Sequence, residues 1–425
     1  MEISQIYKNF KTCNSISTDT RKITQNSMFF CLKGANFDAN QFAESALNSG
    51  AKYVVVDNAE YKLNDQCILV EDTLKALQSV ANYHRKQFRI PFIGITGTNG
   101  KTTTKELINN VLRKKYKTHA TSGNLNNHIG VPLTLLSMPL DTEIAIIEMG
   151  ANHPFEIKEL CEIAEPDYGL ITSIGKAHLE GFGSLEGVIK TKKELYDFIE
   201  MKGERVFVPS NSEILLSISK GLNRLIYGNP ENSDYKGEIY DTSDETVSLN
   251  INGSIIRSNL VGHYNFINLM AAYAVGNFFG INDDDFKIAI ESYQPQNQRS
   301  QLMKIKTNTI VLDAYNANPT SMEAALLSLK SSNYSSKSVI LGDMLELGDE
   351  SIAEHQHIIE ILRTLQIENA ILIGPVFHSL NSEFLSFENN LEAKDYLTAH
   401  PWENQYILIK GSRGIAVEKV LSALE

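Results

Sequence analysis

Short apolar runs alternate with longer amphipathic stretches along most of the chain. The runs at 90–95 and 144–147 are short and apolar, which is typical of buried strands. The stretch 104–115 instead repeats apolar residues three and four positions apart, which is typical of a helix with one buried face. Strand, helix and strand in this order predict a mostly parallel sheet whose strands are joined by crossover helices.

The alternation falls into three blocks and predicts an α/β protein of three domains. We expect residues 1–88 to form a small N-terminal α/β domain, residues 89–295 a central domain with a mostly parallel sheet, and residues 296–425 a C-terminal Rossmann-like domain. A chain of 425 residues also exceeds what one hydrophobic core usually supports, so several domains are expected on length alone.

The predicted elements of the first block are strands at 28–32, 53–56 and 68–70 and helices at 41–48 and 73–85. The central block adds strands at 168–174 and 206–208 and helices at 156–163, 185–199 and 266–279. The strands predicted for the third block lie at 309–312, 339–341, 370–373 and 406–409. The polar stretch 228–258 has little helical periodicity and predicts an antiparallel extension of the central domain.

Local signals mark the borders of some elements. The polar, proline-interrupted run 293–298 predicts a linker before the third block. Two helices of that block are expected to open on capping boxes, in which a hydroxyl residue precedes a glutamate by three positions. The two pairs are Thr320 with Glu323 and Ser351 with Glu354.

The charge balance excludes some partners. The chain has 39 Lys and Arg against 51 Asp and Glu, a net charge of −12, which argues against sequence-independent attraction to nucleic acid or to an anionic membrane. Anionic substrates must therefore be met by local basic patches. The first ten residues lack the apolar core of a signal peptide, and no stretch approaches about 18 uncharged apolar residues, so we expect a cytoplasmic protein without membrane insertion.

The cysteines suggest neither a metal site nor a disulfide framework. They are far apart and include no C-x-x-C pair, so we expect them to pack in the core. The four are Cys13, Cys31, Cys67 and Cys161.

The most informative polar segment is the glycine-rich run 94–103, which lies between a predicted strand and a predicted helix. Gly97 and Gly100 allow backbone N–H groups to converge on phosphate oxygens. Lys101 can reach the outer phosphates of a nucleoside triphosphate, and the Thr102 hydroxyl can hold Mg²⁺ at the helix N-terminus. Ile95 rather than a glycine stands six residues before the lysine, so the spacing departs from the common phosphate loop, and a chance glycine-rich turn is the alternative.

The loop Thr-Gly-Thr-Asn-Gly-Lys-Thr-Thr resembles that of the Mur ligases and the folylpolyglutamate synthetases. Three further segments resemble the Mur ligases that add D-alanyl-D-alanine to a muramoyl tripeptide: Glu-Met-Gly-Ala-Asn-His-Pro at 148–154, the run at 175–184, and Asp-Ala-Tyr-Asn-Ala-Asn-Pro-Thr-Ser-Met at 313–322. The resemblance extends from 19–21 to 410–414 and so covers nearly the whole chain.

The resemblance implies an ATP-dependent, Mg²⁺-requiring amide ligase that forms a UDP-MurNAc-pentapeptide for peptidoglycan. Its substrates would be UDP-MurNAc-tripeptide, held in part by the first domain, and D-Ala-D-Ala; a monomer is expected. The implied phosphate-binding residues of the loop are Gly97, Thr98, Asn99, Gly100, Lys101, Thr102 and Thr103.

Glu148 and His178 are the glutamate and histidine that the resemblance makes ligands of a second Mg²⁺. The sequence alone places Glu148 at the end of the apolar run 144–147, hence at the carboxyl edge of a parallel strand, where ligand sites of α/β sheets collect. By the same reasoning His178 is expected to end the next such run. Without the motifs, a surface or satisfied core position would be the simpler interpretation of each residue.

The segment 191–196 resembles the one in which Mur ligases carry a lysine carbamylated by CO₂, and Lys192 takes that position. A neutral lysine amine captures CO₂ and becomes an anion that can approach Mg²⁺, which requires a shifted pKa. The alternative is that Lys190, Lys192 and Lys193 form a solvated basic helix face.

Further roles follow from the resemblance. Asn268 would recognise adenine, for which its amide offers both a donor and an acceptor, whereas Asn265 is expected to be a helix N-cap. Arg299 and Asp313 would reach across an interdomain cleft to phosphate or ribose. Without the resemblance, the simpler interpretation is that Arg299 is a surface arginine and Asp313 an aspartate at the end of a strand.

The implied substrate contacts are spread over all three domains. Ser/Thr hydroxyls and an arginine near the N-terminus suit the UDP diphosphate, although an ordinary exposed turn has the same composition. The loop 123–130 would contact the muramoyl peptide, and many relatives have Glu where His128 stands. The expected substrate residues are Thr18, Asp19, Arg21, Asn126, Asn127, Asn316, Asn318 and Arg413.

Three alternatives remain open at this point. Another Mur ligase, adding diaminopimelate or lysine, would typically carry Asp-Tyr-Ala-His-Thr-Pro where this chain has its motif at 313–319. A folylpolyglutamate synthetase would lack the first domain. A nucleotide-switched binding protein would hydrolyse ATP without forming an amide, and it would have no need for Glu148, Lys192 and His178 together.

Overall fold

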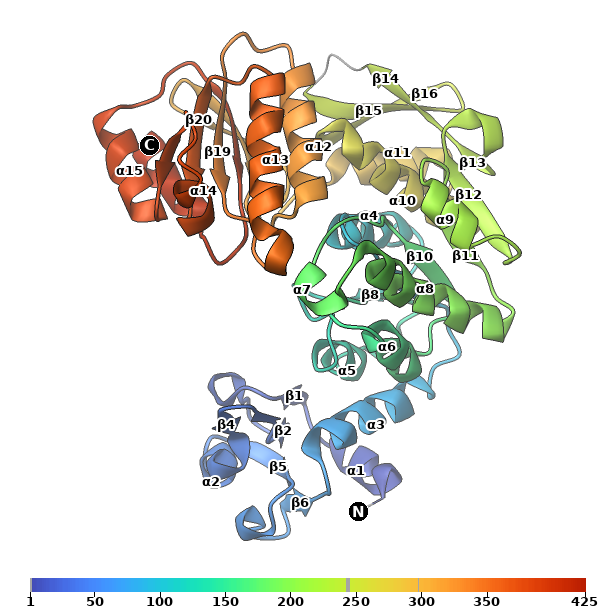
Figure 1. Ribbon diagram of the computed structural model, residues 1–425. Helices are drawn as coiled ribbons and strands as arrows, with labels where there is room; N and C mark the ends of the chain where they lie inside the picture. The colour runs from blue at the N-terminus through green and yellow to red at the C-terminus, as the bar shows by residue number, and fades with distance from the viewer. Residues whose placement is uncertain (1, 242–244, 297) are drawn as a thin grey trace.

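Three α/β units follow one another along the chain in the computed structural model, which describes residues 2–241, 245–296 and 298–425 (Figure 1). The first unit lies at the bottom of Figure 1, the central unit at the right and the third at the upper left. Each has its own sheet, and the sheet of the central unit is parallel throughout. The predicted α/β class is therefore confirmed.

The first unit is built on a four-stranded parallel sheet in the order β1-β2-β5-β6. Its strands are β1 (Ser15–Ser17), β2 (Ser27–Phe30), β5 (Ala51–Val56) and β6 (Cys67–Leu69), beside a small hairpin of β3 (Lys33–Gly34) and β4 (Phe37–Asp38). Its helices are α1 (Ile3–Phe10), α2 (Ala43–Asn48) and α3 (Thr73–Arg85). Helix α3 has the predicted bounds, because the Asp72 side chain accepts from the backbone N–H of Lys75 and fixes its start. Helix α1 and strand β1 were not predicted.

The central unit has seven parallel strands in the order β13-β12-β11-β10-β7-β9-β8. They are β7 (Phe92–Thr96), β8 (Thr118–Ala120), β9 (Ile144–Glu148), β10 (Tyr168–Ile171), β11 (Val206–Pro209), β12 (Arg224–Gly228) and β13 (Tyr235–Lys236). Strands β7, β9 and β11 are buried at every position, which is why they are continuous apolar runs in the sequence.

The helices of the central unit cover both faces of this sheet. They are α4 (Lys101–Leu112), α5 (Gly130–Leu136), α6 (Glu156–Ala164), α7 (Leu179–Phe182), α8 (Leu185–Lys202), α9 (Glu213–Ile218), α10 (Phe266–Phe278) and α11 (Asp283–Ser292). Helix α4 begins three residues before the predicted start, directly after Gly100. Gly100 is its N-cap and has left-handed backbone, with a φ of 81°.

The predicted antiparallel extension is confirmed in the described part of 228–258. It consists of β14 (Glu238–Asp241), β15 (Thr246–Ile251) and β16 (Ser254–Val261), while β13 from the same stretch joins the parallel sheet. Residues 242–244 of this stretch and Asn297 of the predicted linker lie outside the described residues.

The third unit has a six-stranded sheet in the order β17-β18-β22-β19-β20-β21, in which only β17 is antiparallel to its neighbour. Its strands are β17 (Gln301–Ile305), β18 (Asn308–Asp313), β19 (Lys337–Gly342), β20 (Asn369–Ile373), β21 (Leu385–Phe387) and β22 (Tyr406–Lys410). Its helices are α12 (Pro319–Ser331), α13 (Ser351–Thr364), α14 (Pro375–Ser379), α15 (Asn390–Ala399) and α16 (Leu421–Leu424). The Rossmann-like alternation predicted here is confirmed.

Both predicted capping boxes are wrong. Helix α12 starts earlier, with Asn318 as N-cap and Ser321 completing the box, so Thr320 is already helical. Ser351 is the first residue of α13 because a 3₁₀ turn, Gly348–Glu350, leads directly into the helix and no side chain caps it. The hydroxyl-to-glutamate spacing therefore occurred inside the first helical turn in both cases.

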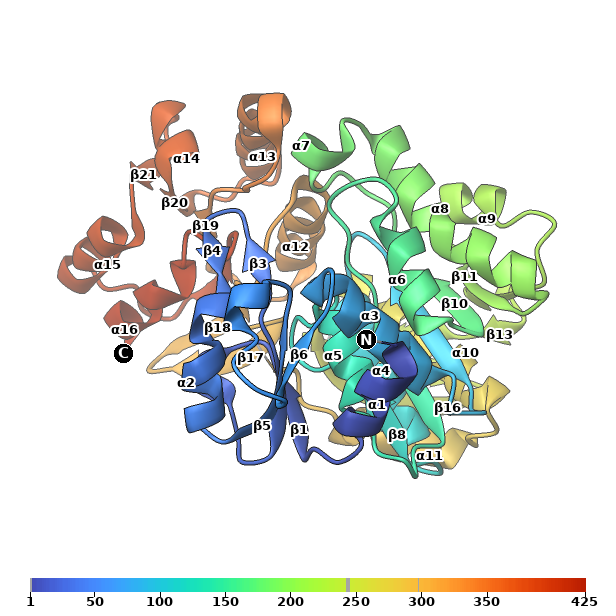
Figure 2. The ribbon, with the colours of Figure 1, turned by 90° about the horizontal axis from the view of Figure 1, so that it is seen from below.

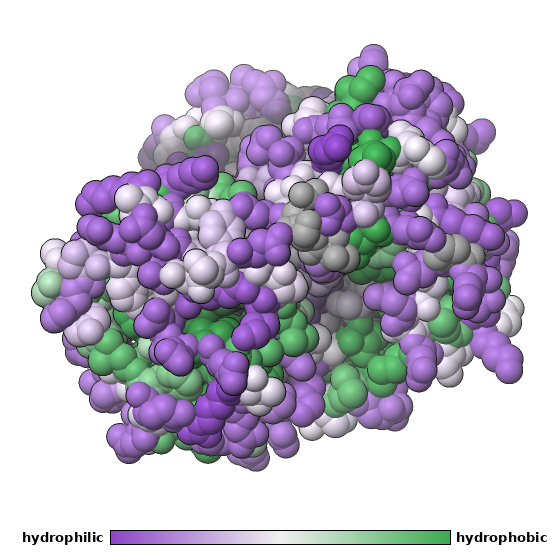
Figure 3. All heavy atoms as spheres, turned by 90° about the horizontal axis from the view of Figure 1, so that it is seen from above, coloured by the Kyte–Doolittle hydropathy of each residue, from purple (hydrophilic) through white to green (hydrophobic). Residues whose placement is uncertain are grey.

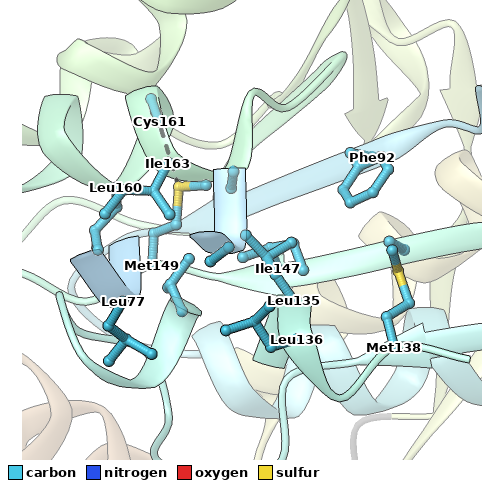
Figure 4. Close-up of a cluster of buried hydrophobic side chains, with 14 of the residues drawn as sticks. Leu77, Phe92, Leu135, Leu136, Met138, Ile147, Met149, Leu160, Cys161 and Ile163 are labelled. Carbon is cyan, nitrogen blue, oxygen red and sulfur yellow. Dashed lines mark hydrogen bonds between the residues drawn. The ribbon is translucent and has the colours of Figure 1, made fainter. Parts of the chain in front are cut away.

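The first and central units share one apolar core. Leu77 of α3 packs with Leu135, Leu160 and other side chains of the central unit in a single cluster (Figure 4), and Figure 2 shows α1 and α3 lying over this unit. The cysteines are free, and all but the half-buried Cys13 are buried, as expected. Cys161 contacts Met149 within the cluster.

Polar side chains cover most of the face in Figure 3, where apolar ones form scattered patches. Within the described residues, no helix is both long enough and apolar enough to cross a membrane.

Candidate active site

A cavity of about 800 Å³ lies where the carboxyl edges of two sheets face one another. The central unit contributes the segments that follow β7, β9 and β10, and the third unit contributes the ends of β18 and β22. Ligands of open α/β sheets bind at this edge, so the cavity has the position expected of an active site.

The glycine-rich loop forms one wall. Gly97 has a φ of 143°, and a Cβ built there would lie 2.1 Å from Oγ1 of Thr172, so the close approach of the loop to the end of the neighbouring strand β10 requires glycine. The backbone N–H of Thr98 donates to the Ser173 carbonyl, and that of Asn99 to the Ser173 hydroxyl. The six residues from Thr98 to Thr103 line the cavity, and Gly97 is not part of its lining.

Lys101 is folded back over this loop. Its Nζ donates to the carbonyls of Gly97, at 2.6 Å, and Thr98, at 3.0 Å. Burial lowers the pKa of Lys101 to about 8, with the negative Glu148 opposing the shift and the positive Arg299 adding to it. A phosphate group bound at the loop would replace these two carbonyls as the partner of the lysine.

Glu148 ends β9, as predicted, and is 1% exposed. Its Oε1 accepts from the Thr102 hydroxyl at 3.2 Å and from the Asn126 amide at 2.8 Å. Its other oxygen, Oε2, is buried and has no hydrogen-bond partner among the described residues. A buried carboxylate oxygen left free beside a hydroxyl fits a divalent cation, since hard cations prefer oxygen ligands.

The protein side chains alone do not form a complete metal cage. Within the described part of the chain, no three His, Cys, Asp or Glu side chains gather as a metal-binding group. A Mg²⁺ ion beside Glu148 would therefore take its remaining ligands from nucleotide phosphates and water, as Mg²⁺ commonly does.

His178 does not end a strand, which corrects the prediction. Strand β10 stops at Ile171, and His178 is the N-cap of the short helix α7 with a φ of 51°. It still lines the cavity, because the segment after β10 runs along the sheet edge. Its Nδ1 is in close contact with Oε2 of Glu346 from the third unit, without the alignment of a hydrogen bond. Burial lowers the pKa of His178, and the negative Glu346 opposes this shift.

Lys192 is buried on α8 and 2% exposed, so the solvated-face interpretation is wrong for this residue. Its Nζ donates to the Ala151 carbonyl at 3.3 Å and lies 5.3 Å from the centre of the Phe182 ring. Burial, reinforced by the positive Lys101, lowers the pKa of Lys192 well below its ordinary value, which favours the neutral amine. The neighbouring Lys193 instead pairs with Asp197 near the surface.

Asn268 and Asn265 lie side by side where α10 begins. The Asn268 amide donates to Oδ1 of Asn265 at 2.8 Å, and its carbonyl oxygen accepts from the Thr104 hydroxyl at 3.1 Å. Asn265 occupies the N-cap position but does not cap the helix, since its amide donates backwards to the Val261 carbonyl. Both side chains line the cavity next to the phosphate loop.

Arg299 and Asp313 line the opposite wall. The Arg299 guanidinium lies 3.6 Å from the centre of the Tyr315 ring, and its buried Nε lacks a hydrogen-bond partner among the described residues. Asp313 is paired with the buried Lys410 and accepts from the backbone N–H of Ser300 at 3.1 Å. Neither residue is a plain surface group.

The expected substrate residues fall into two sets. Asn126, Asn127, Asn316 and Asn318 line the cavity, and Asn318 exchanges amide hydrogen bonds with Asn99 across the two units, at 2.7 and 3.3 Å. The others lie outside the lining of the described cavity: Thr18, Asp19 and Arg21 on the first unit, and the exposed Arg413 on the third. Hydrogen bonds from Arg21 lower the pKa of Asp19 to about 2.

Sequence reasoning missed Lys410, Tyr315 and Glu346. Lys410 ends β22 beside Asp313 at the end of β18, so the strand-end argument used for Glu148 could have found it. Glu346 had no such signal, because it lies in a loop whose direction depends on contacts far away in the sequence.

Comparisons with known proteins agree with this architecture. Three family models match in order: "Mur ligase family, catalytic domain" at residues 12–85, "Mur ligase middle domain" at 95–276 and "Mur ligase, glutamate ligase domain" at 298–413. The UDP-N-acetylmuramoyl-tripeptide--D-alanyl-D-alanine ligase of Bacillus subtilis is 36% identical over 426 residues, which cover 97% of this chain and 93% of that protein.

Solved structures give the same result. A crystal structure of MurF from Acinetobacter baumannii matches with a TM-score of 0.87 at 28% identity, covering 99% of this chain and 98% of that one. The MurF ligase of Thermotoga maritima in complex with ADP matches with a TM-score of 0.86 at 26% identity, covering 97% of each chain. The chain therefore belongs to the UDP-N-acetylmuramoyl-tripeptide--D-alanyl-D-alanine ligase branch of the Mur ligase family.

Proposed function

We propose that this protein is an ATP-dependent ligase that joins UDP-MurNAc-tripeptide to D-Ala-D-Ala and releases ADP and phosphate. The observation that carries the proposal is the meeting of a phosphate loop and Glu148 with Arg299 and Asp313 on one cavity. The names of the full-length relatives support the choice of substrates.

The reaction needs a better leaving group than hydroxide on the tripeptide carboxylate. Transfer of the γ-phosphoryl group from ATP makes an acyl phosphate, and the amine of D-Ala-D-Ala then displaces phosphate and loses a proton. The reacting groups are anionic, so cations must surround them. In this proposal Lys101 and Arg299 supply positive charge from opposite walls of the cavity.

Thr102, Glu148 and His178, with a carbamate on Lys192, are the residues that would hold Mg²⁺. When bound, the ion neutralises phosphate charge and orients the phosphoryl group. The free oxygen of Glu148 supports its part in this set. For Lys192, burial and the lowered pKa support carbamylation, because CO₂ reacts with the unprotonated amine.

The nucleotide would lie along the phosphate loop with adenine at Asn268. Both functional atoms of this amide already have partners, Thr104 and Asn265, so adenine recognition would use the second lone pair and the second N–H. Asp313 and Arg299 would meet ribose or phosphate from the third unit.

The substrate would be held at several places. We assign Thr18, Asp19 and Arg21 to the UDP group and Asn126 and Asn127 to the muramoyl peptide. In the third unit, we assign Asn316, Asn318 and Arg413 to contacts with the substrate. Asn316 and Asn318 line the cavity.

The test is phosphate release with ATP and UDP-MurNAc-tripeptide, with and without D-Ala-D-Ala, alongside mass spectrometry of the product. We expect release to depend on the dipeptide and to match pentapeptide formation one to one. Release without an amide product would indicate a nucleotide-switched binding protein. Activity with UDP-MurNAc-dipeptide plus diaminopimelate or lysine, but not with these substrates, would assign the chain to another Mur ligase.

A further inference from the structure

Glu346 brings a carboxylate of the third unit onto His178 of the central unit. Its Oε2 is in close contact with Nδ1 of the imidazole, and both residues line the cavity. Both also have left-handed backbone, with φ of 62° for Glu346 and 51° for His178. Such backbone is uncommon outside glycine and persists where the surrounding structure holds it.

The chain leading to Glu346 is fixed on the third unit. The backbone N–H of Met344 donates to Nε2 of the buried His355 at 3.0 Å, and that of Leu345 donates to the Ser412 hydroxyl at 2.9 Å. Leu347 on the other side is 2% exposed. The Glu346 side chain is therefore presented from a rigid base rather than from a free loop.

Helix α13, which follows this segment, docks on the central unit through an ion pair. Nζ of Lys176 lies 2.5 Å from Oε1 of Glu354, whose side chain is 7% exposed. Between this ion pair and the His178 contact, Gly348 lies against Glu180, so that a Cβ at Gly348 would be 3.5 Å from the Glu180 Cα. Figures 1 and 2 both show α7 beside α13 at this contact.

We infer that Glu346 is a positioning residue for His178, which takes the Nδ1 side of the imidazole and leaves Nε2 for the divalent cation. Because Glu346 belongs to the third unit, the metal site is then complete only when that unit is docked. The inference rests on the proposed function, which makes His178 a metal ligand. Metal-binding histidines usually donate their other ring N–H to a carboxylate or carbonyl, and here the partner comes from another part of the chain.

The test measures the affinity of the protein for Mn²⁺ by electron paramagnetic resonance. Mn²⁺ is titrated at a fixed ADP concentration, with and without the full-length protein. Glu346→Ala should weaken the protein-dependent Mn²⁺ binding by about 10- to 100-fold, the usual effect of losing such a partner. Glu346→Gln keeps the size of the side chain and should give a smaller loss. Asp349→Asn is the matched control, because this exposed carboxylate has no hydrogen-bond or ion-pair partner among the described residues. The Mn²⁺ affinity of this variant should equal that of the wild type.

A double-mutant cycle separates positioning from a general structural effect. In a His178→Ala background, Glu346→Ala should cause no further loss of Mn²⁺ affinity, because its effect passes through the histidine. Lys176→Met removes the docking pair without changing Glu346 or His178, and it should weaken Mn²⁺ binding in the same direction.

The inference is overturned by wild-type affinity in folded Glu346→Ala or Glu346→Gln, by losses that add in the cycle, or by an unaffected Lys176→Met variant. Wild-type protein that binds no Mn²⁺ beyond ADP alone would instead remove the metal from the proposed function, and the inference with it. Thermal melts establish that each variant is folded.

Discussion

Two lysines with lowered pKa values show how surroundings rather than residue type decide chemistry. Lys101 and Lys192 each have a lowered pKa because burial penalises the ammonium form, and the positive charge of Lys101 lowers the pKa of Lys192 further. Lys101 lies in the cavity lining, where phosphate would restore its charge, whereas Lys192 lies behind it against Ala151. We therefore expect opposite uses: a cation for phosphate and a neutral amine for CO₂.

Replacing Lys101 by Ala should abolish most turnover and leave the fold intact. In the proposed function this cation stabilises developing phosphate charge, so kcat should fall on the order of 10² to 10³ without it. Phosphate release measures the loss, and a thermal melt checks the fold. Lys114→Ala, an exposed lysine just beyond the same helix, should behave as wild type. Ligase activity of Lys101→Ala within about tenfold of wild type would contradict the assignment.

Lys192→Ala should lose a similar factor, about 10² to 10³, whereas Lys193→Ala should be mild because that side chain pairs with Asp197 near the surface. The sign of the pH effect follows from the amine. The lowered pKa keeps it neutral at lower pH than an ordinary lysine, and acid below that range protonates it and releases CO₂.

Wild-type enzyme depleted of bicarbonate at mildly acidic pH should therefore lose activity and recover it when bicarbonate is added. The alanine variant should not respond. The deciding measurement is the mass or the electron density of the side chain, and an unmodified Lys192 in active, substrate-bound enzyme refutes the carbamate.

At the scale of elements, helix α3 joins the first unit to the central one. Its last residue, Arg85, donates to the carbonyls of Ala164, at 3.0 Å, and Glu165, at 2.8 Å, and pairs with Asp167 at 3.1 Å. The guanidinium also lies 3.8 Å from the centre of the Phe92 ring, at the start of β7. The buried Arg85 side chain thus connects the end of α3 with the end of α6 and with β7 of the central sheet.

Arg85→Ala should reduce the free energy of unfolding by about 3 to 5 kcal/mol, because the carbonyls of Ala164 and Glu165 lose their charged donor and Asp167 keeps only Lys202 as an ion-pair partner among the described residues. Arg85→Lys should lose less, since a lysine keeps the charge but not the planar set of donors. Urea unfolding with a constant m-value gives the numbers. The exposed Arg89→Ala is the control and should stay within about 0.5 kcal/mol of wild type. An equally small effect of Arg85→Ala would show that α3 is held by its apolar face alone.

At the scale of the whole molecule, the two junctions between units differ in the extent of their apolar contact. Many side chains of the first and central units form one apolar cluster, whereas Val261 is the central-unit member of the apolar cluster described for the third unit. Other described contacts of the third unit with the central one are polar pairs such as Asn99 with Asn318 and Lys176 with Glu354. Polar contacts reform in water at little cost, so movement should occur at the second junction. We propose domain boundaries at 88/89 and 295/296, with the first two domains moving as one body.

Nucleotide together with the UDP substrate should compact the protein by moving the third unit. Small-angle scattering should show a smaller radius of gyration with both ligands than without them. Spin labels at the exposed Lys62, Lys220 and Thr398, one on each unit, locate the change. The distance between the first two labels should stay constant, and the distances to the third should shorten. Scattering that is unchanged by both ligands would count against closure.

Most of the fold could be predicted because it depends on local pattern. Strands buried on both faces are uninterrupted apolar runs, and α3 has an aspartate N-cap and helical spacing that the sequence displays directly. The phosphate loop is equally local, since its glycines, lysine and threonine are consecutive. Helix starts were less predictable where two overlapping signals competed, as at Asn318 and Thr320.

The sequence by itself determined the α/β class, the phosphate loop and the strand-end position of Glu148, because each depends on residues close together in the chain. Only the tertiary structure decided that Lys192 is buried while Lys193 is near the surface, that Asp313 is paired with Lys410, and that Glu346 reaches His178. Burial and ion pairing depend on which distant segments pack together, and that depends on the free energy of the whole fold rather than on any window of sequence.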